Sequence, residues 1–182
     1  NEFRFFSCRL AVFIDAFYDK KLGKKFIVTG NYQCVKSYDY DDNLQYKVYT
    51  DYKFYDDSNK KEVYGYHDSI KFDDKGEIIK LIESSGKGRI RIWEFHTANL
   101  IKVIEINKYG AFGICLWDNN YIFAGSKRSI KLIDVNQQKV IKKFGGHDHE
   151  IITIKKIEIP KYGKCLISQD RENGSIILWT TE

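Results

Sequence analysis

The sequence has no methionine and only one proline, Pro160, in 182 residues. Because the chain lacks a start residue of its own, we expect it to be a fragment of a longer protein. It also lacks any apolar run near the roughly 18 residues that a membrane-spanning helix needs. The best early stretch, Leu10–Ile14, ends at Asp15, so we expect neither a signal peptide nor a membrane span.

Cysteine is sparse, and no two cysteines are close enough in the sequence to form a Cys-x-x-Cys pair. The four positions are Cys8, Cys34, Cys115 and Cys165. This spacing gives no support to a zinc or redox motif. Three of the four lie in apolar, strand-like runs, where a buried free thiol is the ordinary expectation. Reduced thiols favour an intracellular compartment, and we expect the cytoplasm, with a cytoskeletal or particle-bound location as variants.

No segment keeps a helical period over a dozen residues, so we expect an all-β chain. Hydrophobic residues make up 43% and charged residues 30% of the sequence, which is a globular composition. The net charge of +5 is too small to require a nucleic-acid partner, although it could favour acidic ones.

Four short stretches align on their fourth residue, which we call the anchor. The stretches are VKSYDY, IRIWEF, IKLIDV and IILWTT, and their anchors are Tyr38, Trp93, Ile133 and Trp179. Successive anchors lie 55, 40 and 46 residues apart (38 to 93, 93 to 133 and 133 to 179). A period of about 40–45 residues with a tryptophan–acid ending is the signature of a four-stranded propeller blade. Apolar runs closed by turn residues precede each anchor, as that signature requires.

These repeats resemble the WD-repeat β-propeller family over nearly the whole chain. The resemblance implies a propeller of four-stranded antiparallel blades, in one section covering residues 1–182. Approximate repeats fall at 3–40, 44–95, 100–135 and 139–181. Since propellers carry roughly four to eight blades, we expect part of a larger propeller, with a closed four-bladed ring as the alternative. In such a ring the segment EFRFFS (residues 2–7) would complete the last blade.

The last repeat matches the family best. In the family, a His, a Ser or Thr, an Asp and a Trp form a hydrogen-bonded structural network. The matching positions here are His147, Ser168, Asn173 and Trp179. Asn173 stands where the family has Asp, and one extra residue in SQDREN leaves Asp170 as a possible substitute. The other three repeats are degenerate at these positions.

The stretch His147–Glu150 contains two histidines and two acids, which could suggest a metal or acid–base site. Two ligands in one short loop do not make a site, and the resemblance assigns His147 to the structural network. No nucleophile elbow or phosphate-binding glycine loop is present in the sequence. We therefore predict a protein that is not an enzyme and that has no catalytic residue, cofactor or metal.

Basic residues recur in the turns between the second and third strands of the repeats. By the family resemblance these turns share one rim with the connections between blades. The candidate binding rim comprises Tyr32, Lys87, Arg89, Lys127, Arg128 and Arg171. Fixed cations there would pair with acidic or phosphorylated segments, although plain solvated turns are the simpler interpretation. A long insertion at 51–67, either functional or solvated, extends the first gap.

The leading functional hypothesis is a non-catalytic scaffold that presents loops to other proteins within a larger, multi-subunit complex. The first alternative is an RNA-associated propeller of a ribonucleoprotein complex, because aromatic residues reach 15% beside basic turns. The second is an interaction domain attached to a catalytic domain outside this chain. Fold resemblance by itself does not decide among them.

Overall fold

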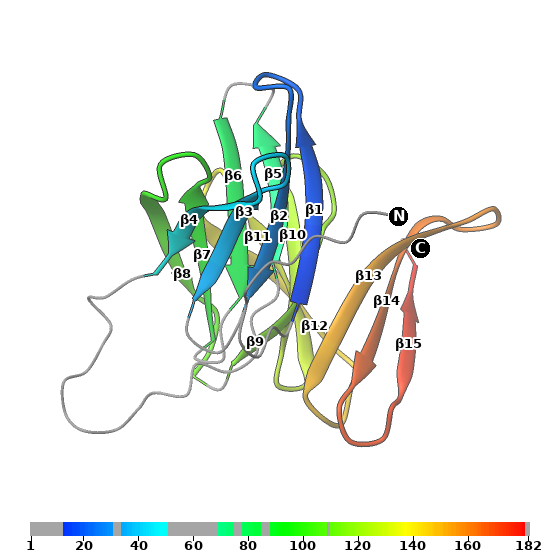
Figure 1. Cartoon of the computed structure of the whole chain (residues 1–182). Helices are drawn as coiled ribbons and strands as arrows, with labels where there is room; N and C mark the ends of the chain where they lie inside the picture. Colours follow the sequence, from blue (N-terminus) through cyan, green and yellow to red (C-terminus); the bar gives the residue numbers. More distant parts are fainter. Residues whose placement is uncertain are drawn as a thin grey trace.

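The computed structural model describes residues 13–30, 34–50, 69–74, 78–84, 88–108 and 110–180. These residues form antiparallel β-sheets whose strands pair in chain order (Figure 1). The first sheet contains β1 (Phe13–Asp19), β2 (Lys24–Gly30), β3 (Val35–Asp39) and β4 (Leu44–Tyr49). The second contains β5 (Ser69–Asp74), β6 (Ile78–Ser84), β7 (Arg89–Glu94) and β8 (Leu100–Glu105).

The third sheet contains β9 (Ala111–Leu116), β10 (Tyr121–Ser126), β11 (Ser129–Asp134) and β12 (Lys139–Gly145). The fourth has three strands in the described part of the chain, β13 (Ile151–Ile159), β14 (Gly163–Asp170) and β15 (Ile176–Trp179). No helix among the described residues is long and apolar enough to cross a membrane. The prediction of an all-β chain built from antiparallel blades is confirmed, and the architecture is that of a partial propeller.

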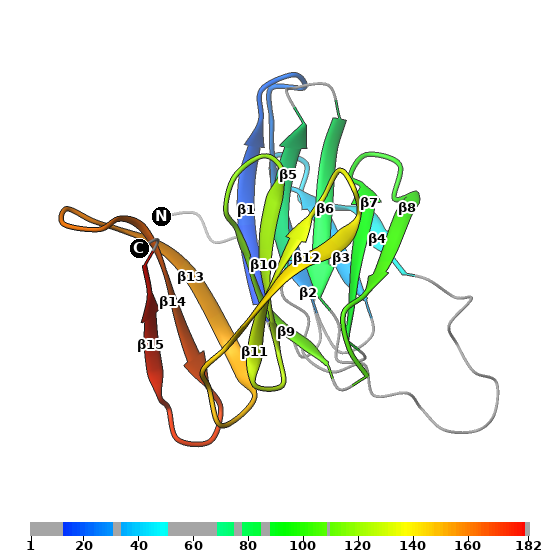
Figure 2. The ribbon, with the colours of Figure 1, turned by 180° about the vertical axis from the view of Figure 1, so that it is seen from behind.

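Neighbouring sheets meet through their first strands. β1 contacts β5, β5 and β6 contact β9, and β9 and β10 contact β13. The fourth sheet lies at one flank of the molecule in both views (Figures 1 and 2). A hydrophobic cluster fills each of the three spaces between consecutive sheets, and most of its members are aliphatic or aromatic strand residues that alternate with more polar ones.

The third and fourth sheets approach each other closely at Gly113 of β9. A Cβ atom at this position would lie 2.9 Å from the carbonyl oxygen of Ile152 on β13. Gly113 also has a positive φ of 61°. Glycine is therefore required here both for backbone conformation and for space.

All four anchors occupy equivalent positions in the third strand of their sheets. Tyr38, Trp93, Ile133 and Trp179 pair with Ile27, Leu81, Ile122 and Leu166 of the second strand, respectively. In the first three sheets a β-bulge immediately precedes the anchor, where the third strand pairs with the fourth. Five residues after the anchor, each of these sheets has a non-glycine residue with positive φ: Asn43, Ala98 and Gln138.

The fourth strand of each complete sheet belongs to the next repeat of the sequence. β4, for example, begins the predicted repeat 44–95 but pairs with β3, so repeats and sheets are offset by one strand. The predicted strand at residues 2–7 and the insertion at 51–67 lie outside the described residues.

Candidate functional site: polar networks and the loop rim

His147, in the link between β12 and β13, lies at the centre of a buried polar network. Its Nε2 is 2.7 Å from the Ser168 hydroxyl, and its Nδ1 is 3.3 Å from a carboxylate oxygen of Asp170. The indole N–H of Trp179 donates to the same Ser168 hydroxyl at 2.7 Å. Because Ser168 accepts from Trp179, its own proton is available to His147 Nε2, which leaves the Nδ1 proton facing Asp170. A single histidine tautomer thus satisfies every contact.

The carboxylate of the network belongs to Asp170 and not to Asn173. β14 continues to Asp170, which pairs with Ile151 at the start of β13 and so lies beside His147. Asn173 sits in the following turn, and its backbone N–H donates to Asp170 at 3.2 Å. Burial would raise the pKa of Asp170, but hydrogen bonds from His147 and from the backbone of Asn173 and Ser175 hold that pKa below its usual value. The sequence matched Asn173 to the family's Asp because the loop SQDREN has one extra residue.

In the second sheet a buried ion pair replaces this network. Glu83 follows Leu81 by two residues, as Ser168 follows Leu166, and it pairs across the strands with Arg91. The side chains of Glu83 and Arg91 are both buried and form an ion pair. The Arg91 guanidinium also lies 5.9 Å from the centre of the Trp93 ring. The sequence signal for this pair is the acid Glu83 at the position opposite Arg91, where the first and third sheets have Thr29 and Ala124.

In the third sheet an amide takes the place of the histidine. Asn107 precedes β9 by four residues, as His147 precedes β13. Its Nδ2 donates to the Ser126 hydroxyl and to the Gly110 carbonyl, each at 2.7 Å, and its Oδ1 accepts from the Gly110 N–H at 2.9 Å. Asn107 therefore ties the link between sheets to the end of β10. The second and third sheets thus replace the network with two different polar arrangements.

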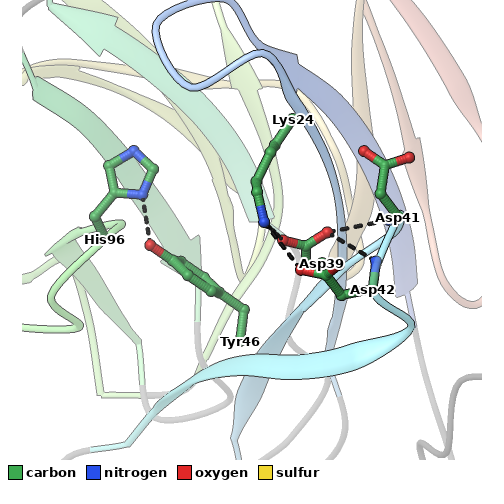
Figure 3. A network of polar contacts seen from close by, with 6 residues as sticks. All are labelled: Lys24, Asp39, Asp41, Asp42, Tyr46 and His96. Atoms are coloured by element: carbon green, nitrogen blue, oxygen red, sulfur yellow. Dashed lines mark hydrogen bonds and ion pairs between the residues drawn. The ribbon is translucent and has the colours of Figure 1, made fainter.

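A second polar cluster lies at the opposite end of the first sheet (Figure 3). Asp39, the acid after the Tyr38 anchor, accepts hydrogen bonds from the backbone N–H groups of Asp41 and Asp42. Lys24 contacts the carboxylates of Asp39 at 2.6 Å and of Asp42 at 3.0 Å. The hydrogen bond from Lys24 lowers the pKa of Asp39 more than burial raises it, and the two carboxylates raise the pKa of Lys24. The acid after the anchor is therefore a turn cap.

His96 joins the second sheet to the first at this same end (Figure 3). Its Nδ1 is 3.0 Å from the Tyr46 hydroxyl, and its Nε2 is 2.9 Å from a carboxylate oxygen of the buried Asp19. The other Asp19 oxygen accepts from the backbone N–H groups of Lys21 and Leu22. Burial, followed by the Asp19 charge, raises the pKa of Tyr46. These contacts fix the geometry of two turns and one interface between sheets.

Two arginines of the predicted rim pair with acidic side chains. Arg89 pairs with Glu105 at 3.3 Å, and Arg171 pairs with Glu150 at 2.9 Å. Arg171 also lies over the Phe112 ring, 5.3 Å from its centre. Lys127 and Arg128 are both exposed in the turn between β10 and β11. Tyr32 and Lys87 lie outside the described residues.

Among the described residues, no group of three or more His, Cys, Asp or Glu side chains could hold a metal ion. His149 pairs with Glu172 at 2.9 Å, on the exposed side of the loop that contains His147. Cys115 and Cys165 are buried free thiols, and Cys34 is partly buried. A cavity of about 350 Å³ lies between the third and fourth sheets and is lined mainly by apolar side chains, including Trp117, Phe123, Phe144 and Trp179.

The sheet architecture and the equivalent anchors give this chain the fold of a propeller section, and this fold is like that of WD40 repeat structures. Among solved structures it is similar to the RRP9 WD40 repeats, with a TM-score of 0.67 and 13% identity over 95% of this chain and 49% of that one. It is equally similar to U3-55K, with a TM-score of 0.67 and 12% identity over 96% of this chain and 50% of that one.

The computationally designed Ika4 protein aligns with a TM-score of 0.60 and 13% identity, over 86% of each chain. The chain thus spans about half the length of the two natural WD40-type chains. No family model and no curated protein matches the sequence. At these identities the likeness defines the fold alone.

Proposed function

We propose that this chain is a non-catalytic protein-interaction scaffold that presents the turns of a propeller section to partners in a larger assembly. The observation that carries the proposal is that the described clusters of ionisable side chains serve the framework. His147, His96 and Asp39 each hold a turn or an interface between sheets. Contacts with neighbouring protein groups account for the placement of all three side chains.

The surface that supports partner binding best is the turn between β10 and β11. Lys127 and Arg128 are adjacent there, and both side chains are exposed. A pair of exposed cations on a rigid hairpin attracts acidic segments and accelerates their encounter. We therefore narrow the predicted rim to this turn, and we propose that partners there carry acidic segments.

In the described part of the chain, the aromatic residues give less support to the RNA alternative than the composition alone suggested. The aromatic residues that suggested base stacking, such as Phe26, Tyr49, Trp93 and Phe95, are buried between the first and second sheets. Tyr18 is the one aromatic side chain among the large apolar residues described as exposed. Stacking platforms for single strands require exposed aromatic faces.

Charge reversal at matched positions tests the proposal. Lys127→Glu with Arg128→Glu reverses two cations in the β10–β11 turn, and Lys20→Glu with Lys21→Glu reverses two in the β1–β2 turn at the opposite end of the strands. Both pairs are exposed. Each variant replaces two cations with two glutamates, so the two variants have the same net charge. Association with an acidic peptide, followed by surface plasmon resonance at two salt concentrations, should slow for the first variant only. Equal slowing would show that only bulk charge is sensed, and tighter binding of single-stranded RNA would favour the RNA alternative.

A further inference from the structure

β1 carries an exposed isoleucine, Ile14, whose equivalents in the third and fourth sheets are buried. Ile14, Ile114 and Ile154 occupy equivalent positions in the first strands of three sheets, opposite Thr29, Ala124 and Ser168. Ile114 and Ile154 are 2% and 1% exposed, because each faces the sheet that precedes its own. Ile14 is 73% exposed. Ile14 thus has the residue type and strand register of two buried isoleucines, but among the described residues no preceding sheet packs against it.

The fourth sheet shows the complementary feature on its opposite face. Val35, Ile90, Ile130 and Ile176 each lie three residues before the anchor of their sheet. The first three are at most 1% exposed and face the sheet that follows, whereas Ile176 is 63% exposed. Leu178 repeats the contrast, since it is 43% exposed and its equivalent Ile92 is 2% exposed.

These two faces are the halves of one interface that the chain already forms three times. Every internal interface joins the following face of one sheet to the preceding face of the next. The exposed Ile14 face is a preceding face, and the exposed Ile176 face is a following face. An aliphatic side chain that is exposed where its described equivalents in other sheets are buried indicates a surface that another sheet covers.

We propose that two copies of this chain assemble head to tail, with the β1 face of each copy against the β13–β15 face of the other. A second copy is the occupant that supplies both missing halves, since each chain carries one preceding and one following face. Two equivalent head-to-tail contacts close a two-fold ring. This inference depends on the fold and is independent of the proposed scaffold function.

The test measures mass in solution and blocks each face separately. The 182-residue chain has a mass of 21.4 kDa, and sedimentation equilibrium should give twice that value at micromolar concentration. Ile14→Lys and Leu178→Lys should each weaken association roughly tenfold or more, because a lysine would be buried without a partner. Ile141→Lys is the control. Ile141 is 43% exposed, as Leu178 is, but lies on the outer strand β12, and this variant should stay dimeric.

Mixing the two blocked variants distinguishes head-to-tail from face-to-face assembly. The Leu178→Lys chain keeps an intact β1 face, and the Ile14→Lys chain keeps an intact β13–β15 face. Together they should form a heterodimer through one sound interface, although each alone is monomeric. A wild-type chain that stays monomeric would overturn the proposal. A mixture that does not recover the dimer, or a single variant that dimerises as wild type does, would overturn it equally.

Discussion

The indole N–H of Trp179 and the hydroxyl of Ser168 are joined by a 2.7 Å hydrogen bond across the β14–β15 pair. Through Ser168, the anchor of the last sheet is connected to His147 and so to the link from the preceding sheet. Replacing Trp179 with Ala should therefore destabilise the chain by about 3 kcal/mol, the lower end for a large aromatic, since this side chain is only partly buried. Urea unfolding followed by circular dichroism would measure the change.

His147→Ala should destabilise the chain less than Trp179→Ala does. Its effect on stability should also not be additive with that of Trp179→Phe, which keeps an aromatic ring but removes the N–H group. Both substitutions disturb Ser168, so a double-mutant cycle should give a coupling of about 0.5 kcal/mol or more. Additive effects would show that the three side chains act independently.

Asp170 and Asp39 are carboxylates whose pKa is lowered in the folded chain. Acid should therefore reduce their contribution to the stability of the fold. A carboxylate with a lowered folded pKa contributes stability that is complete above its unfolded value of about 3.9 and is lost as the pH falls through the folded value. Asp170→Asn should therefore reduce stability at pH 7 and flatten the decline below about pH 4. Asp148→Asn, at an exposed neighbour of His147, is the control and should reduce stability at pH 7 less than Asp170→Asn does.

The buried pair Glu83–Arg91 predicts that the double variant is more stable than the single variant that lacks only Arg91. Arg91→Met removes the counter-ion of a buried carboxylate and should cost about 3–5 kcal/mol. Adding Glu83→Met should recover most of that loss, because a packed apolar pair of similar size is often as stable as a buried ion pair. Thermal unfolding of the three proteins decides the matter, and a double variant less stable than Arg91→Met would contradict the assignment.

Two glycines separate the effect of close packing from that of backbone conformation. Gly113 and Gly163 both have positive φ, but a Cβ atom would meet Ile152 at Gly113 and nothing within 4 Å at Gly163. Gly163→Ala should cost about 1 kcal/mol through backbone strain alone. Gly113→Ala should cost about 1–3 kcal/mol more, because the third and fourth sheets would have to separate. Equal losses in a denaturant titration would argue against the close approach.

The sequence by itself determined the strands, their order and the four equivalent anchors. These features depend on alternation, turn chemistry and a repeat period, all of which are local properties of the chain. The resemblance of the last repeat to the WD-repeat family also pointed to His147, Ser168 and Trp179, which the structure brings within hydrogen-bond distance. It could not place the carboxylate, because one extra loop residue left Asp170 and Asn173 both available.

Only the tertiary structure decided which charges are neutralised and which faces are covered. Glu83 meets Arg91 because β6 and β7 pair in one particular register, and Arg171 meets Glu150 across the ends of separate strands. Sequence patterns mark both members of such pairs as polar but do not contain the distance between them. Ile14 and Ile154 likewise have the same residue type and the same strand position. Their different exposure follows from the presence of a neighbouring sheet, which is a property of the assembled fold.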